Sequence, residues 1–141
     1  MKNTKGNLRL KKVTKREYQF LYDLLLERNP IVNISHKKMP TYEEHVKFVG
    51  SQPYSKWYII FYSDKECGSI YLSKTDEIGI FLKKGMAKKG IGSKALKILM
   101  KENPRRRYLA NINPKNKNSI SFFKKYHFKL LQHTYELSKH R

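Results

Sequence analysis

The stretch EIGIFLKKGMAKKGIGSKALKIL, residues Glu77–Leu99, joins a short apolar run to a longer periodic one through a loop of lysines and glycines. Its first six residues, Glu77–Leu82, are rich in Ile and Phe, which is typical of a β-strand. From Ile91 onward the apolar residues recur at helical spacing, and Pro104 ends that pattern. The sequence therefore predicts a strand, a glycine-rich loop and a helix in direct succession.

Similar patterns on both sides of this stretch predict the other elements of one domain. Two extended runs, Lys56–Ser63 and Cys67–Ser73, precede it with only short turns between them, which favours an antiparallel meander. Thr14 and Thr41 each have a glutamate three residues later, which is the spacing of a capping box at a helix start. Further strands are expected at Leu8–Val13, Arg107–Ile112 and Phe128–Leu137, and a short helix that holds Ile120, Phe123 and Tyr126.

This order of elements predicts a single α/β domain over residues 1–141. The first strands are expected to pair antiparallel because the turns between them are short. Parallel pairing is expected across the helix between the fourth and fifth strands, because such a crossover returns the chain to the sheet in the same direction.

The composition favours an anionic partner. The 141 residues contain 31 Lys and Arg against 11 Asp and Glu, a formal net charge of +20, and such a field attracts nucleic acids, anionic lipids or phosphorylated small molecules. Cys67 is the one cysteine, which excludes intramolecular disulfides and multi-cysteine zinc sites and fits a cytoplasmic location. No histidine spacing indicates a metal site, no apolar run is long enough to span a membrane, and the basic N-terminus lacks the apolar region of a secretory signal.

The lysine–glycine loop matches two known phosphate motifs only in part. Gly85 and Gly90 have the spacing of a Walker motif, but Ile91 follows where the motif needs lysine. Gly90, Gly92 and Ala95 satisfy the dinucleotide pattern G-x-G-x-x-G/A, but a seven-residue loop separates them from the preceding strand. A third interpretation needs neither fold, because the glycines let backbone N–H groups at the start of the helix approach a pyrophosphate.

Two segments resemble the signature of the Gcn5-related N-acetyltransferase (GNAT) family. The loop AKKGIGS, Ala87–Ser93, is similar to the family's Q/R-x-x-G-x-G/A loop, and NPKNKNSISFFKKYHF, Asn113–Phe128, is similar to its Asn, short helix and Y-x-K-x-G-F segment. With the element order, the resemblance covers about Leu8–Leu137. It implies a GNAT fold with a mixed sheet of six to seven strands and about four helices, and acetyl-CoA-dependent transfer of an acetyl group to a primary amine.

The resemblance also implies which residues bind acetyl-CoA. Backbone groups of the loop and its lysines would bind the pyrophosphate, and the main chain of Ile80 and Leu82 would pair with the pantetheine as an added strand does. Ala87 departs from the family pattern, because Gln or Arg is usual there. The expected cofactor-binding set is Ile80, Leu82, Lys88, Lys89, Gly90, Ile91, Gly92, Ser93, Asn116 and Phe123.

The resemblance implies an incomplete set of catalytic residues. Phe123 stands where many members carry the tyrosine that protonates the departing thiolate, so Tyr126, one helical turn later, is the expected acid. Glu77 lies where the family often has a carboxylate that takes a proton from the amine through water. His45 and His36 are the other base candidates, because a histidine side chain titrates near neutral pH.

The acceptor is expected to bind at Arg28–Val49. This region is similar to that of family members that acetylate nucleotide-linked amino sugars and of those that act on ribosomal protein N-termini, and the positive charge favours an anionic amine over a polyamine. The expected partner is therefore a small-molecule amine, and the chain is expected to be a monomer or a homodimer. Two alternatives stay open: a non-catalytic acyl-CoA-binding domain, motivated by Phe123, and a basic nucleic-acid-binding domain.

Overall fold

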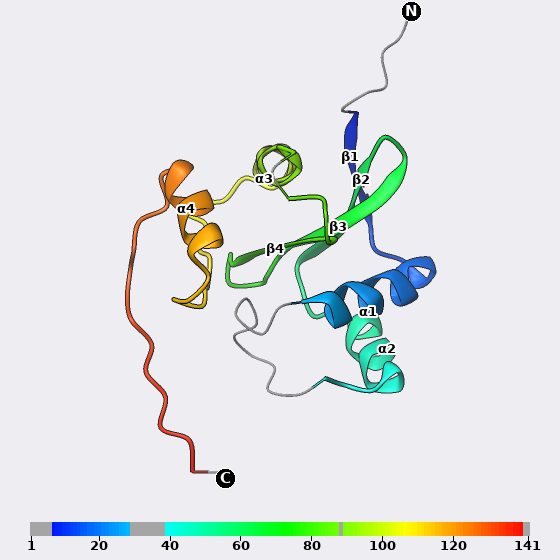
Figure 1. Ribbon diagram of the computed structural model, residues 1–141, viewed down its shortest axis with the longest axis horizontal. Coiled ribbons are helices and arrows are strands. Elements are labelled where there is room, and N and C mark those ends of the chain that lie inside the picture. Colours follow the sequence, from blue (N-terminus) through cyan, green and yellow to red (C-terminus); the bar gives the residue numbers. More distant parts are fainter. Residues whose placement is uncertain (1–6, 29–38, 88, 140–141) are drawn as a thin grey trace, which may run out of the picture.

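Nine helices and strands follow one another in the computed structural model, which describes residues 7–28, 39–87 and 89–139 (Figure 1). Their order is β1 (Leu8–Lys12), the 3₁₀ turn η1 (Lys15–Glu17), α1 (Tyr18–Glu27), α2 (Tyr42–Gly50), β2 (Lys56–Tyr62), β3 (Lys65–Leu72), β4 (Ile78–Leu82), α3 (Ile91–Glu102) and α4 (Lys117–Lys125).

Two of the helical segments begin at the predicted capping boxes. Before η1, the Thr14 N–H donates to Glu17 Oε1 at 2.7 Å, and the Thr14 side chain caps the turn in return. Thr41 and Glu44 form the same arrangement before α2, where the Thr41 N–H donates to Glu44 Oε1 at 2.8 Å. These reciprocal bonds satisfy backbone donors that a helix start otherwise leaves without partners.

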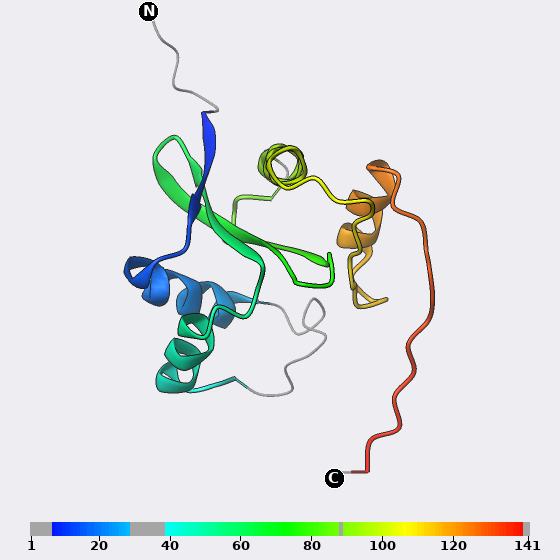
Figure 2. The same ribbon diagram turned by 180° about the vertical axis from the view of Figure 1, so that it is seen from behind.

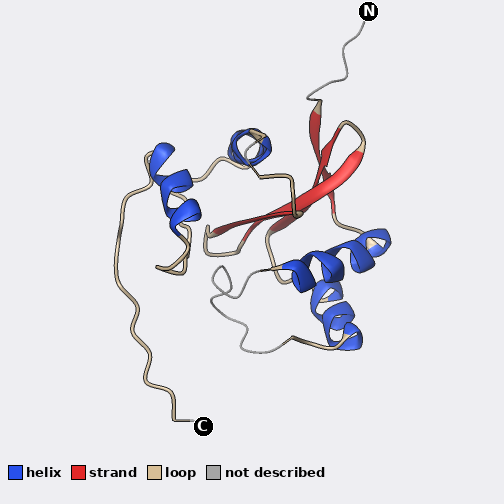
Figure 3. Cartoon of the chain, in the orientation of Figure 1, coloured by secondary structure: helices blue, strands red, loops and turns tan. Residues whose placement is uncertain are grey.

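The sheet consists of β1, β2, β3 and β4 in that order, and every neighbouring pair is antiparallel (Figure 3). The predicted meander is confirmed, because β2, β3 and β4 pair in succession. Ile70 of β3 lies opposite both Tyr58 of β2 and Ile80 of β4. The side chains of these three residues, and of every second residue along each strand from them, therefore point to the same face of the sheet. The register between β2 and β3 shifts after Ile60, which lies opposite Gly68, and the pairing continues with Phe61 opposite Glu66.

Helices cover both faces of this sheet. On one face the buried side chains of Ile60 and Ile70 belong to a core with Leu96 of α3. On the other face Ile59 packs with Leu21 of α1 and with residues of α2. Figures 1 and 2 show α3 and the α1–α2 pair on opposite sides of the strands, with α4 beside α3. Within the described ranges, none of the helices is long and apolar enough to cross a membrane.

The predicted sheet of six to seven strands is wrong for the described residues, where the sheet has four. Among the described residues, the expected strand Arg107–Ile112 forms backbone hydrogen bonds with the sheet only at Leu109, whose N–H donates to the Asp76 carbonyl at 2.8 Å and whose carbonyl accepts the Ile78 N–H at 2.7 Å. The result is a single bridge between Glu77 and Leu109, which is parallel as expected. A strand does not form because no second pair of backbone bonds continues this bridge in the described residues.

The predicted strand Phe128–Leu137 also does not form. These residues run along an extended path away from the sheet (Figures 1 and 2). Their alternating apolar pattern suits a strand, but a strand also needs a neighbouring backbone, and no described strand lies beside this segment. Phe128 packs against the core, whereas the large apolar side chains after it are 65–89% exposed: Leu130, Leu131, Tyr135 and Leu137.

Candidate functional site

The N-terminus of α3 carries backbone donors that no side chain caps. Gly90, the residue before the helix, has a φ of 76°, a left-handed conformation that glycine adopts without strain. The Lys94 N–H donates to the Gly90 carbonyl at 3.1 Å, so the N–H groups of Ile91, Gly92 and Ser93 have no acceptor within the helix. Together with the helix dipole, these donors favour the binding of an anion.

Helix α4 packs closely against this helix start. A Cβ added to Gly92 would lie 3.4 Å from the Phe122 ring of α4, an ordinary van der Waals distance, so α4 lies next to this helix start. The Ser93 hydroxyl contacts the Tyr126 hydroxyl, and the Tyr126 ring lies 5.3 Å from the Phe122 ring. The predicted acid therefore lies at the predicted cofactor loop, although α4 is distant from that loop in the sequence.

Positive charge surrounds the start of α3. The ammonium groups of Lys97 and Lys125 each lie 5.9 Å from the centre of the Tyr126 ring. Lys89 is exposed next to Gly90. The other predicted loop cation, Lys88, lies outside the described residues, as does the base candidate His36. Where the structure describes the chain, no group of three His, Cys, Asp or Glu side chains is placed to hold a metal ion.

The outer edge of β4 is open beside this loop. The Ile78 N–H bonds the Leu109 carbonyl across that edge, so the alternation of an antiparallel ladder directs the backbone groups of Ile80 and Leu82 the same way. Among the described residues no backbone bond joins these two to a segment on that side. Their side chains pack against the core that includes α3. An extended chain can therefore pair with Ile80 and Leu82, and the pairing with pantetheine that the family resemblance implies stays a prediction.

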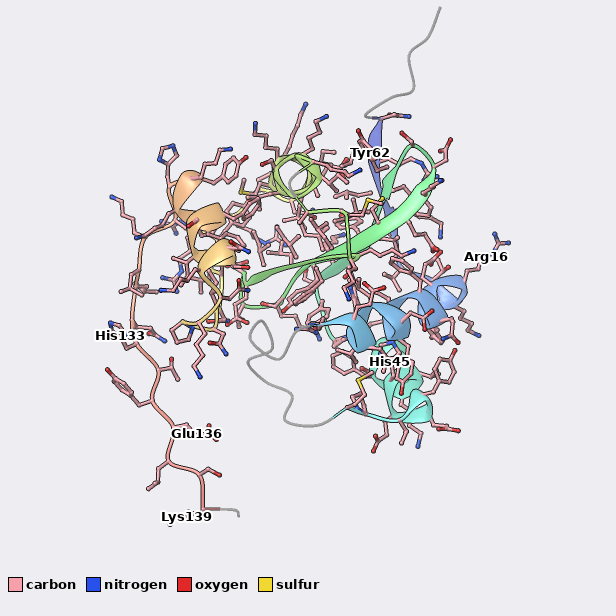
Figure 4. The ribbon with its side chains drawn as sticks, in the orientation of Figure 1. Arg16, His45, Tyr62, His133, Glu136 and Lys139 are labelled. Carbon is pink, nitrogen blue, oxygen red and sulfur yellow. The ribbon has the colours of Figure 1, made fainter. Side chains whose placement is uncertain are left out.

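A cavity of about 240 Å³ lies on the other face of the sheet, between the strands and helices α1 and α2. Aliphatic side chains of α1 and five aromatic side chains form most of its wall. Figure 4 labels His45 on α2, where this helix faces α1. The aromatic lining residues are Phe48, Tyr54, Trp57, Tyr71 and Phe81, and the polar ones are Arg28, Glu44, His45 and Ser69.

Tyr54 and Tyr71 form a stacked pair in the wall of this cavity. Their ring centres are 3.8 Å apart and their planes differ by 3°. Burial raises the pKa of both hydroxyls; the neighbouring Tyr71 adds to the rise at Tyr54, whereas the charge of Arg28 opposes it. Both hydroxyls therefore stay protonated at neutral pH. The Tyr54 hydroxyl donates its hydrogen bond to Tyr71, so the Tyr71 hydroxyl is the one that can donate to a bound molecule.

Arg28, the residue after α1, lies against Phe81 of β4. Its Cζ is 3.8 Å from the centre of the Phe81 ring, the geometry of a cation–π contact. The Lys84 N–H donates to Glu27 Oε1 at 2.8 Å, which ties the end of α1 to the segment after β4 and holds Arg28 beside the ring. Burial lowers the pKa of the guanidinium, and the neighbouring tyrosines oppose that shift. Because arginine starts from a very high pKa, the side chain stays charged.

Both described base candidates lie on the cavity side of the sheet. The Glu77 carbonyl accepts the Ser73 N–H at 2.8 Å, so Glu77 continues the ladder of β4 and its side chain faces the same way as Tyr71. The Ser73 hydroxyl accepts the Glu77 N–H at 3.0 Å and donates to Glu77 Oε1 at 3.4 Å. His45 is buried, with 5% of its surface exposed, and its ring lies 5.2 Å from the Tyr22 ring.

The two predicted cofactor residues of α4 have partners within the fold. Asn116 caps this helix, because its Oδ1 accepts the Ser119 N–H at 3.2 Å and its amide donates to the Ser119 hydroxyl at 2.9 Å. Phe123 is 7% exposed and packs edge-to-face against Phe122 and Phe128. Contacts of Asn116 and Phe123 with acetyl-CoA therefore stay predictions.

Sequence reasoning misses the aromatic wall of the cavity. Trp57, Tyr71 and Phe81 each have the pattern of a buried strand residue, and Arg28 is expected only as one end of the acceptor region. One signal was present: each of the three strands carries an aromatic residue at a position that the register places on the same face as Glu77. A sheet face that carries several aromatic rings together with a carboxylate is unusual for a hydrophobic core, because glutamate is rarely buried there.

A comparison with protein families gives one match. The model described as the acetyltransferase (GNAT) family matches residues 18–128, which include both the loop before α3 and the whole of α4. No curated protein matches the sequence.

Solved structures show the same fold. A domain from Methanocaldococcus jannaschii has a TM-score of 0.80 at 21% identity, covering 93% of this chain and 94% of that one. RimL, a ribosomal alpha-N-protein acetyltransferase in complex with coenzyme A, has a TM-score of 0.73 at 21% identity, covering 92% and 84%. Spermidine N-acetyltransferase from Vibrio cholerae, in complex with CoA and spermine, has a TM-score of 0.70 at 11% identity, covering 84% and 78%.

Proposed function

This chain belongs to the GNAT family of acetyltransferases, which use acetyl-CoA, and we propose that it transfers the acetyl group to a primary amine held in the cavity between the sheet, α1 and α2. The observation that carries this proposal is the position of β4 between two features. Its open edge lies beside the uncapped start of α3, and its Phe81 side chain lines the cavity.

The residues at the open edge fit the cosubstrate. When bound, acetyl-CoA supplies an acetyl group as a thioester, which an amine can attack. The N–H groups of Ile91, Gly92 and Ser93 would hold its phosphates, because they point out of a helix start that no side chain caps. Ile80 and Leu82 would pair with its pantetheine, and an N–H group on this edge would polarise the thioester carbonyl.

Two side chains are proposed to move protons. Glu77 lies on the cavity face of the sheet at the start of β4. From there its carboxylate accepts the proton of the amine by way of a bridging water molecule. His45, buried in the cavity wall, is the second base candidate. Tyr126 is the proposed donor of a proton to the departing thiolate, which restores coenzyme A; its hydroxyl contacts Ser93 at the start of α3, the end of the site proposed for the phosphates. A thiolate is also a fair leaving group without an acid.

Two classes of molecule are candidates for the acceptor that supplies the amine: a nucleotide-linked amino sugar and a protein N-terminus. The ribosomal alpha-N-protein acetyltransferase RimL is an example of the second kind among the similar folds. The net charge of +20 favours the anionic amino sugar.

We further propose that the chain forms a single domain and acts in the cytoplasm. There its one cysteine, the buried and free Cys67, would stay reduced.

The test has two steps. Calorimetry or thermal shift with acetyl-CoA measures cosubstrate binding, and the absence of any stabilisation at millimolar acetyl-CoA would refute the proposed function. Release of free thiol with a panel of nucleotide-linked amino sugars and short peptides then measures transfer. Binding of acetyl-CoA without turnover on any amine would instead support a non-catalytic acyl-CoA-binding domain, and steeply salt-dependent binding of RNA or DNA would support the basic nucleic-acid-binding alternative.

A further inference from the structure

Arg28 is the one lysine or arginine among the described residues that line the cavity. The contact between Glu27 and Lys84 fixes its backbone, and the Phe81 ring covers one face of its guanidinium. A charged group in such an apolar wall loses much of its hydration, which is unfavourable unless another charge or a set of acceptors replaces the water.

Among the described residues, no carboxylate forms an ion pair with Arg28. The Arg28 Nε is buried and has no hydrogen-bond partner, and the ion pairs of the described residues do not include Arg28. The one carboxylate in the cavity lining belongs to Glu44, and its Oε1 accepts the Thr41 N–H at 2.8 Å. The Phe81 ring covers the flat face of the guanidinium. The N–H groups of the guanidinium point outward in its plane, where a pair of them can donate two parallel hydrogen bonds to an oxyanion.

We propose that the acceptor amine carries an anionic oxygen group, a carboxylate or a phosphate, which Arg28 binds beside Phe81. This inference rests on the proposed function, because it assigns the cavity to the acceptor. The Tyr71 hydroxyl, kept protonated by burial, is an additional donor for the same group. A polyamine would place a second positive charge beside Arg28 and is therefore expected to bind more weakly than an anionic amine.

The test compares amines that differ in one charged group. The probes are tyrosine against tyramine for a carboxylate, and glucosamine 6-phosphate against glucosamine for a phosphate, with spermidine as the cationic member. Each is assayed with the full chain and acetyl-CoA by thiol release. Each is also titrated calorimetrically in the presence of coenzyme A, so that binding is measured without turnover. We expect at least one anionic member to have a kcat/KM, or a binding constant, at least tenfold above that of its neutral partner.

Three variants locate that preference. Arg28→Gln is expected to abolish it by raising the KM or the Kd of the anionic member at least tenfold, while the values for the neutral partner change less than threefold. Arg28→Lys is expected to keep part of it, because the charge remains but the planar pair of donors does not. Arg16→Gln is the matched control, since Arg16 is an exposed arginine that points away from the cavity (Figure 4), and this variant is expected to keep the full preference.

The outcomes separate this inference from the proposed function. If amines are acetylated but the anionic and neutral members of each pair behave alike, or if Arg28→Gln keeps the preference, the inference is wrong and the proposed function stands. If acetyl-CoA does not bind, the proposed function is wrong, and the calorimetric titrations of the anionic probes alone then decide whether Arg28 binds them. Loss of thermal stability in Arg28→Gln without any change in preference would give Arg28 a purely structural role.

Discussion

The Tyr71 ring on β3 lies directly over Gly79 on β4, and it can do so only because glycine has no side chain. A Cβ on Gly79 would overlap the ring and would lie 2.6 Å from the hydroxyl oxygen. The ring stacks with Tyr54 on the wall of the cavity. Gly79 therefore determines where the Tyr71 hydroxyl lies relative to the proposed acceptor.

Gly79→Ala is expected to displace the Tyr71 ring, to cost about 1–3 kcal/mol of unfolding free energy through overpacking, and to raise the KM of the acceptor. Urea denaturation and steady-state kinetics measure the two effects. In a Tyr71→Ala background the added methyl group has room, so the same substitution should then cost little. An equal cost in both backgrounds would show that the ring is not what Gly79 accommodates.

Gly92→Asp is expected to weaken acetyl-CoA binding by about 100-fold or more, because the new carboxylate would lie among the N–H groups proposed to hold the phosphates. Calorimetry measures the Kd. Gly92→Ala is the steric control, since a Cβ there makes only an ordinary contact with Phe122 at 3.4 Å, and it should retain binding within a few-fold. Gly92→Asn has the shape of aspartate without the charge, so equal losses in Asn and Asp would contradict the electrostatic explanation.

Glu77→Gln is expected to lower kcat by about 10²–10⁴-fold with little change in the KM of either substrate, because the amide cannot accept the proton from the amine. His45→Gln is measured in parallel. If His45→Gln lowers kcat to that extent and Glu77→Gln leaves kcat within twofold of the parent, the base is His45 and the assignment of Glu77 is wrong.

Tyr126→Phe is expected to lower kcat at least tenfold, since the departing thiolate would lose its proton donor, while the Kd of acetyl-CoA stays within threefold. Ser93→Ala provides the control, because it removes the hydroxyl that contacts Tyr126 but leaves the acid in place. Equal increases of the Kd in both variants, with kcat unchanged, would mean that the hydroxyl pair serves cosubstrate binding and that Tyr126 is no acid.

Glu17→Gln is expected to reduce the unfolding free energy at pH 7 by about 1–3 kcal/mol, because a buried carboxylate loses charge-assisted hydrogen bonds. Burial alone would raise the pKa of Glu17, but the bonds from Lys11, at 2.8 Å, and from Thr14 outweigh burial and lower it. A lowered folded-state pKa means that this stabilisation is complete above the ordinary pKa of glutamate and is lost as the pH falls through the folded-state pKa.

Urea denaturation over a range of pH checks the prediction for Glu17. The difference between parent and variant should be largest at neutral pH and should shrink toward pH 3. The exposed capping box at Glu44 offers a comparison, and Glu44→Gln should cost less because water competes for its bonds. A difference for Glu17 that stays constant with pH would contradict the role of its charge.

The local elements could be predicted because their causes lie within a few residues. Thr14 and Thr41 cap helical segments with the glutamate three positions later, and the left-handed Gly90 begins α3 where the loop pattern places it. The meander followed from short turns between strongly apolar runs. Whether Phe128–Leu137 forms a strand could not be predicted from such local causes. Its alternating apolar and polar residues are compatible with a strand, but they do not specify which strand would pair with it.

For the candidate site, the sequence by itself determined the loop that can hold an anion and the strand edge beside it, because glycine conformation and helix start are local properties. Only the tertiary structure decided how many strands pair, since Leu109 makes a single bridge to Glu77. It also decided that Arg28 meets Phe81 in an aromatic cavity and that Tyr71 lies over Gly79. The contact between Arg28 and Phe81 joins residues distant in the chain and depends on helix packing, and the one between Tyr71 and Gly79 depends on the register of two neighbouring strands. Short sequence patterns encode neither.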